Sequence, residues 1–155
     1  MSSKKRSRAH MLIRMLAFLA YILLLTYFLI FAELMGRGNK PDNYAYNLVL
    51  FREIGRFIEY RHILGMRTVL LNLVGNVVGF MPLGFILPLV SRKAKNGFVS
   101  IFYVFLFSLI LELIQLVAKV GSFDVDDLLL NTVGGILGYI VYFIGSSMVK
   151  NKETV

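Results

Sequence analysis

Four long apolar segments, separated by short polar stretches, most constrain how this chain can fold. Each is about 20 residues long, the length at which a helix crosses the hydrocarbon of a bilayer. A bilayer core offers no hydrogen-bond partners, so each segment must pair its own backbone groups as a helix. The sequence therefore predicts an all-α membrane protein, a four-transmembrane-helix bundle with spans at residues 15–32, 69–90, 98–118 and 128–149.

Composition supports a membrane location and excludes several kinds of site. The chain has 155 residues, of which 57% are hydrophobic and 17% are charged, which is too apolar for an ordinary soluble domain. Its net charge of +8 comes from basic residues that border the apolar segments, so we expect the lipid bilayer as partner and no nucleic acid. Cysteine is absent, which excludes disulfides and thiolate sites. We also expect no metal site and no cofactor, since His10 and His62 lie apart in a tail and a loop.

The distribution of Lys and Arg predicts the orientation. Ten of them lie in segments 1–14, 91–97 and 150–155, whereas the seven in the other connections are balanced by seven acids. The positive-inside rule then places both termini of this cell-membrane protein in the cytoplasm. The predicted organisation is a basic tail (1–14), a four-span domain (15–149) and a second tail (150–155).

The first extracellular loop contains an amphipathic pattern over residues 50–64. Its apolar residues recur at helical spacing, while charged residues occupy the other faces; the apolar set is Leu50, Phe51, Ile54, Phe57, Ile58 and Leu64. The pattern predicts an amphipathic helix. It either lies on the outer leaflet or caps the bundle, and the sequence leaves both interpretations open.

Polar residues inside the spans are costly in a bilayer and usually face other helices, a cavity or a substrate path. In the second span, Asn72, Gly75, Asn76 and Gly79 form one helical face. We expect Gly75 and Gly79 to allow close helix packing. In the third span, one stripe holds Ser108, Glu112, Gln115 and Lys119.

The fourth span begins with an acidic cluster. Asp127 and Asn131 share a face, and the glycines that follow are predicted to pack against another helix; the residues in chain order are Asp124, Asp126, Asp127, Asn131, Gly134, Gly135 and Gly138. At about 1.5 Å per residue, the polar stripes of the three spans reach the same outer layer. The pattern predicts an outward-facing polar pocket, with ligand-binding candidates Asn72, Asn76, Glu112, Gln115, Asp124, Asp126, Asp127 and Asn131.

Simpler roles remain open for several of these residues. Asn72, Asn76 and Asn131 could serve only as hydrogen-bonding contacts between helices. Asp124 could be a helix N-cap or a solvated loop charge. For Glu112 we favour a functional role, because a carboxylate this far inside a span is difficult to explain by packing.

Two motifs resemble the VanZ-like family of membrane proteins. The second span reads Asn72-x-x-Gly75-Asn76-x-x-Gly79 followed by Phe80-Met81-Pro82-Leu83-Gly84-Phe85, similar to the family's second-span signature. Residues 112–135 are similar to its Glu-x-x-Gln, Asp-x-Asp-Asp and Asn-x-x-Gly pattern. The resemblance implies an association with resistance to teicoplanin, a lipoglycopeptide that acts outside the membrane on cell-wall precursors.

Three functional hypotheses follow. The first is a non-enzymatic envelope protein whose outer pocket interacts with a lipid, a cell-wall precursor or a lipoglycopeptide and thereby alters antibiotic susceptibility. The second is an intramembrane enzyme that acts on a lipid or lipid-linked precursor, with Glu112 and Asp126 or Asp127 as acid and base. The third is a transporter or accessory subunit that packs through its glycine faces, which leaves a homo-oligomer open.

Overall fold

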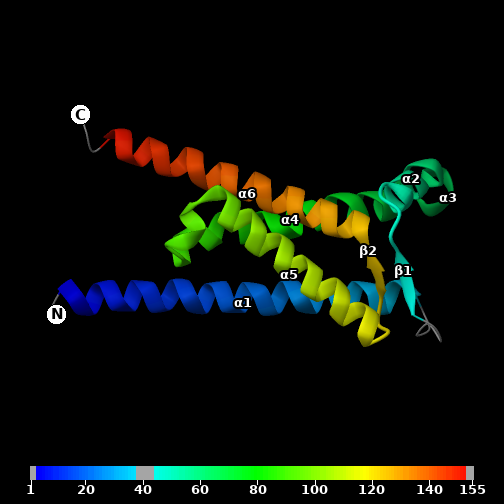
Figure 1. Ribbon diagram of the computed structural model, residues 1–155, viewed down its shortest axis with the longest axis horizontal. Helices are drawn as coiled ribbons and strands as arrows, with labels where there is room; N and C mark the ends of the chain where they lie inside the picture. Colours follow the sequence, from blue (N-terminus) through cyan, green and yellow to red (C-terminus); the bar gives the residue numbers. More distant parts are fainter. Residues whose placement is uncertain (1–2, 38–43, 153–155) are drawn as a thin grey trace.

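A computed structural model of the chain describes residues 3–37 and 44–152, and the side chains of residues 11–30 and 44–149 (Figure 1). The tails predicted at 1–14 and 150–155 therefore lie partly outside the described residues. In chain order, the elements are α1 (Ser3–Arg37), β1 (Ala45–Asn47), α2 (Arg52–Glu59), α3 (Arg61–Leu64), α4 (Met66–Val90), the 3-10 helix η1 (Lys93–Lys95), α5 (Gly97–Val117), β2 (Ser122–Asp124) and α6 (Val125–Lys152).

Four helices in the described part of the chain are long and apolar enough to cross a membrane, which confirms the predicted fold class. Their apolar stretches are Met11–Ile30, Met66–Val90, Gly97–Val117 and Val125–Val149. α1, α4 and α6 extend beyond the predicted apolar limits, because polar residues can continue a helix that hydropathy alone would end, whereas α5 is shifted by one residue. As a result, Asp126 and Asp127 lie in the first turn of α6 rather than in a loop.

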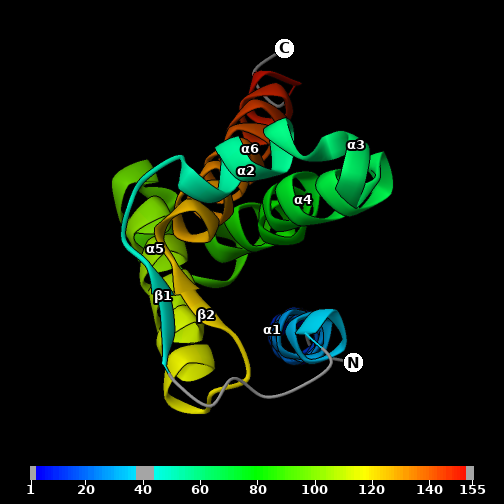
Figure 2. The ribbon, with the colours of Figure 1, turned by 90° about the vertical axis from the view of Figure 1, so that its right-hand side faces the viewer.

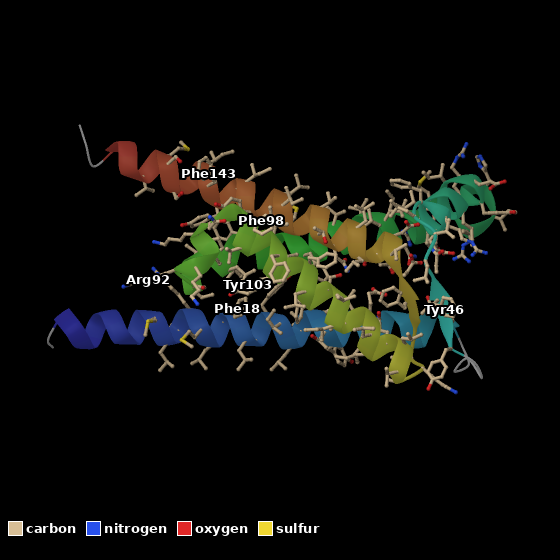
Figure 3. All side chains as sticks on the ribbon, in the orientation of Figure 1. Phe18, Tyr46, Arg92, Phe98, Tyr103 and Phe143 are labelled. Atoms are coloured by element: carbon tan, nitrogen blue, oxygen red, sulfur yellow. The ribbon has the colours of Figure 1, made fainter. Side chains whose placement is uncertain are left out.

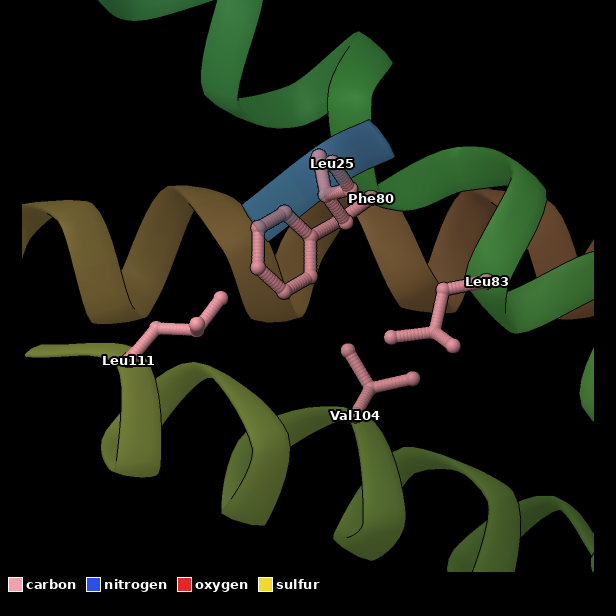
Figure 4. Close-up of a cluster of buried hydrophobic side chains, with 5 residues drawn as sticks. All are labelled: Leu25, Phe80, Leu83, Val104 and Leu111. Atoms are coloured by element: carbon pink, nitrogen blue, oxygen red, sulfur yellow. The ribbon is translucent and has the colours of Figure 1, made fainter. Parts of the chain in front are cut away.

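Three of the four long helices pack closely together, and the fourth lies apart from them. Helices α4 and α6 lie side by side and α5 crosses them, whereas α1 is set apart when the bundle is viewed from its end (Figure 2). A small apolar core joins them, formed by Leu25, Phe80, Leu83, Val104 and Leu111 (Figure 4). Leu25 is the contribution of α1, which also packs against this core through partly buried residues such as Phe18 and Ile22.

The two ends of the bundle differ in structure. One end, here called the strand end, contains residues 44–64 and 118–127, and Tyr46 lies there (Figure 3). The other end contains the basic turn between α4 and α5, where Arg92 lies (Figure 3). Asn96 caps α5 at this end, since its Oδ1 accepts the backbone N–H of Val99 at 3.2 Å.

Two short strands at the strand end were not predicted. β1 and β2 pair in parallel, with Ala45 opposite Ser122 and Asn47 opposite Asp124. Three-residue strands leave little periodicity in a sequence. Their pairing joins the first loop to the connection between α5 and α6.

The amphipathic segment of the first loop is helical but not continuous. The helix predicted over residues 50–64 is two short helices, α2 and α3, which meet at Tyr60. α2 contacts both α4 and α6, which agrees with a helix that caps the bundle. Leu50, Phe51 and Ile58 nevertheless remain about half exposed.

Candidate functional site

A cavity of about 580 Å³ lies between α1 and the three packed helices, in the half of the bundle nearer the strand end. This volume is within the usual range of small-molecule sites. Its lining residues are Tyr21, Leu24, Leu25, Phe28 and Leu29 of α1, Leu71, Asn72, Gly75, Asn76, Val78, Gly79 and Pro82 of α4, Leu111, Glu112 and Gln115 of α5, and Asp127 and Asn131 of α6.

The polar wall of this cavity brings together six of the eight ligand-binding candidates. α4 contributes two amides, α5 a carboxylate and an amide, and α6 a carboxylate and an amide; these are Asn72, Asn76, Glu112, Gln115, Asp127 and Asn131. They come from three helices because all three polar stripes lie at the same level of the bundle.

Hydrogen bonds hold parts of this wall in place. Asn76 Nδ2 donates to Asp127 Oδ1 at 2.6 Å, which links α4 to α6. Asn131 Nδ2 donates to Ser108 Oγ at 2.9 Å, which links α6 to α5. Interhelical bonding, the simpler role considered for the asparagines, therefore applies to Asn76 and Asn131. Both side chains also line the cavity, so the two roles coexist.

Glu112 is the most buried charged residue of the polar wall, with 4% of its surface exposed. Its Oε2 accepts the backbone N–H of Asp124 at 2.8 Å. This bond ties α5 to the residue that precedes α6. A glutamine at this position would retain an acceptor oxygen for the same N–H, so the charge of Glu112 can be removed without removing this bond.

The opposite wall of the cavity is apolar and comes from α1. The sequence analysis did not assign this helix to the site, because its span carries no polar stripe. Tyr21 was the available signal, as it places a hydroxyl inside an apolar segment. That hydroxyl donates to the backbone carbonyl of Gly79 on α4, so α1 is attached to α4 by a polar contact as well as by Leu25.

Asp126, a predicted pocket residue, does not line the cavity and instead caps α2. Its Oδ1 accepts the N–H of Phe51 at 2.5 Å, and its Oδ2 accepts those of Glu53 at 2.8 Å and Ile54 at 3.2 Å. These donors have no partner within α2, since the first N–H groups of a helix never do. Phe51 also has a left-handed φ of 65°, an unfavourable conformation for a bulky residue. Asp126 is only 1% exposed and therefore has a structural role.

Asp124 is also outside the cavity lining and joins the strands to α6. It takes the N-cap position of α6, where its Oδ1 accepts the N–H of Asp126 at 2.8 Å. The same oxygen accepts from Asn47 Nδ2 at 3.1 Å. Burial raises the pKa of Asp124, while these two hydrogen bonds act in the opposite direction. Of the two roles considered for Asp124, the structure shows the N-cap.

Three glycines of α6 allow neighbouring helices to approach its backbone. A Cβ on Gly134 would overlap the backbone of Val77, and one on Gly138 would overlap that of Met81, both on α4. A Cβ on Gly135 would overlap a valine side chain of α5. This glycine face is therefore used within one chain, so a second copy cannot pack against it.

The two glycines of α4 differ from this pattern. Gly75 was predicted to pack against another helix, but a Cβ there would meet nothing within 4 Å in the described structure. Gly75 borders the cavity instead. A Cβ on Gly79 would lie 3.4 Å from Leu25 Cδ1 on α1, an ordinary contact distance. The two glycines have the spacing of a helix-packing motif, but the helix on this side of α4 is α1, which lies apart from the other three.

Residues 18–146, which include the helices that form the cavity, match a protein-family model described as VanZ/LLP1. The chain belongs to the VanZ/LLP1 family. Protein VanZ of Enterococcus faecium is 31% identical over 108 residues, which make up 69% of this chain and 58% of that protein. The chain therefore matches little more than half of that relative's length. No solved structure matches the chain. With its four apolar helices, this VanZ/LLP1 member is a multi-pass membrane protein.

The motifs that suggested this VanZ/LLP1 membership combine different roles. Glu112 and Gln115 both line the cavity. The Asp-x-Asp-Asp motif divides into an N-cap at Asp124, a cap for α2 at Asp126 and a cavity residue at Asp127. No group of three or more metal-binding side chains occurs among the described residues.

Proposed function

We propose that this VanZ/LLP1 protein is a non-enzymatic envelope protein whose cavity binds part of an amphiphile at the outer face of the membrane. The amphiphile would be a lipid, a lipid-linked cell-wall precursor or a lipoglycopeptide. Its binding would change susceptibility to teicoplanin-type antibiotics.

The observation that carries this proposal is the contrast between the two cavity walls. The amides and carboxylates of the lining all come from α4, α5 and α6, which also contribute apolar residues such as Leu71, Val78 and Leu111, whereas α1 supplies four apolar side chains and Tyr21. An alkyl chain gains nothing from a polar wall, and a polar head gains nothing from an apolar one. A molecule that carries both is therefore the best match for this cavity.

The proposed orientation, with both termini in the cytoplasm, places the strand end and the cavity on the outer side. It can be tested with single cysteines, because the chain has none of its own. Tyr46→Cys at the strand end should react with a membrane-impermeant maleimide in intact cells, whereas Lys93→Cys should react only after lysis. The reverse pattern would place the cavity on the cytoplasmic side and refute the proposal.

The functional test compares Glu112→Gln with the wild type in a teicoplanin-susceptible Gram-positive host. The two proteins are expressed at matched membrane levels, and the inhibitory concentration of teicoplanin is measured. The matched control is Glu59→Gln, which removes the same charge from an exposed position on α2. We expect the wild type and the control to protect the host and Glu112→Gln not to. Equal protection by all three would contradict a role for the cavity carboxylate.

The alternative, an enzyme that acts on a lipid or lipid-linked precursor, needs a second carboxylate beside Glu112. Asp126 is engaged with the N-terminus of α2, which leaves Asp127 as the partner in the cavity. Conversion of such a lipid by the purified wild type, lost in both Glu112→Gln and Asp127→Asn, would support this alternative over simple binding.

A further inference from the structure

The ionisable side chains of the described cavity lining are all acidic. Its titratable side chains are the carboxyls of Glu112 and Asp127 and the hydroxyl of Tyr21, and no Lys, Arg or His occurs among its described lining residues. Both carboxylates act as hydrogen-bond acceptors, from the Asp124 N–H and from Asn76 Nδ2 respectively. A phosphate or carboxylate head group would meet groups of like charge here, and no described lining residue would offer it a cation.

A second observation points to a hydrogen-bond donor as ligand. Asn131 lines the cavity and is 2% exposed, and its Oδ1 is buried without a partner in the described structure. A buried acceptor without a partner costs free energy that a donor would restore. Its amide nitrogen is bonded to Ser108, so Oδ1 is the polar atom of this side chain that lacks a partner in the described structure.

Three basic side chains of the strand end have a partner that lies outside the cavity lining. The Lys119 ammonium lies 4.9 Å from the centroid of the Tyr44 ring. Arg56 pairs with Glu53 at 2.5 Å, and Arg61 donates to the carbonyl of Ile58. None of these basic side chains lines the cavity.

We propose that the cavity selects an amphiphile with a primary amine head group. The ammonium would bind the carboxylates of Glu112 and Asp127 beside Asn131, and the alkyl chain would lie along α1. The α1 residues of the lining extend from Tyr21 to Leu29, about 12 Å along the helix at 1.5 Å per residue. This inference rests on the proposed amphiphile-binding function and names the head-group class that the cavity prefers.

The chain contains no tryptophan, so a single introduced tryptophan is a specific fluorescent reporter. Phe28→Trp places it on the apolar wall, at a side chain that is already 58% exposed. The matched control reporter is Val117→Trp, which lies outside this cavity near the same end of its span and is 73% exposed. Each variant is reconstituted in phosphatidylcholine vesicles and titrated with nitroxide-labelled stearylamine or nitroxide-labelled stearyl phosphate, both of which quench tryptophan.

We expect stearylamine to quench the Phe28→Trp reporter at a several-fold lower mole fraction than the Val117→Trp reporter. Stearyl phosphate should quench both equally. Adding Glu112→Gln or Asp127→Asn to the Phe28→Trp reporter should raise the half-quenching mole fraction of the amine about tenfold, as expected for loss of a hydrogen bond to a charged group. Far-UV circular dichroism of each variant establishes that its helices are intact, and two variants are used so that misfolding of one does not decide the result.

Equal quenching by the amine and the phosphate at Phe28→Trp, or an amine preference that survives both substitutions, would overturn this inference. The teicoplanin assay provides the separate readout for the proposed function. Protection of the host without amine selectivity would refute only the head-group class. Amine selectivity without protection would refute the resistance function and leave the binding site standing.

Discussion

Asp126 and Asp127 are adjacent carboxylates with different surroundings, so the same isosteric substitution should destabilise the protein to different extents at the two positions. Asp126 accepts three backbone N–H groups of α2, at 2.5, 2.8 and 3.2 Å. An amide at this position has one acceptor oxygen, and its NH2 group would face backbone donors. With that oxygen in the place of Oδ2, the amide keeps the bonds to Glu53 and Ile54 but leaves the Phe51 N–H facing the NH2 group. A backbone N–H that loses its acceptor in this way gives a destabilisation of about 2 kcal/mol for Asp126→Asn.

Asp127→Asn should cost less than about 1 kcal/mol, because an acceptor oxygen remains for the Asn76 amide. The difference can be measured by unfolding both variants in mixed micelles with increasing SDS, followed by far-UV circular dichroism. Trypsin cleavage after Arg52 and Arg56 reports separately on α2. We expect Asp126→Asn to unfold earlier and to be cleaved faster, whereas Asp127→Asn behaves like the wild type in both assays. Equal stability of the two variants would falsify the assignment of Asp126 to the α2 cap.

Three further predictions concern packing. Gly138→Ala should destabilise the bundle by about 2 kcal/mol or more in the same SDS assay, because its Cβ would overlap the α4 backbone. Gly75→Ala should be neutral or stabilising, because its Cβ would meet no neighbour. Similar losses of stability for both would show that the glycine spacing, rather than the observed contact, determines the cost. Tyr21→Phe removes the hydroxyl that bonds to α4 and should cost about 1 kcal/mol and increase α1 mobility, measured with a spin label on that helix; an unchanged spectrum would argue against this attachment. Asn47→Ala removes bonds to Asp124 and to the N–H of residue 49, and should speed hydrogen exchange in β1 and β2 without affecting the long helices; protected strands would refute that role.

The number and type of the long elements could be predicted from the sequence. Runs of about 20 apolar residues have one stable conformation in a bilayer, so the four spans follow from composition and the hydrogen-bonding rule. Helical periodicity also placed Asn76, Glu112, Gln115, Asp127 and Asn131 on the faces that meet in the cavity. Local spacing is sufficient for this step, because a helix has a fixed rotation per residue.

The partners of these faces could not be predicted. Gly75 and Gly138 both occur in small-residue patterns, but one borders an open cavity and the other touches a neighbouring backbone. The spacing of residues along one helix does not indicate which other helix packs against it. The contribution of α1 to the cavity was missed for the same reason, since its apolar side chains suit lipid and a cavity wall equally well.

The acidic motif shows most clearly what the local sequence determines and what depends on tertiary packing. By itself, the sequence determined that three carboxylates and Asn131 begin the fourth span, and that such groups need polar partners. Only the tertiary structure decided that Asp124 caps α6, that Asp126 caps a helix 75 residues earlier in the chain, and that Asp127 enters the cavity. The physical reason is that the need to satisfy a buried charge is local, whereas the donors that satisfy it are brought close only by the packing of distant segments.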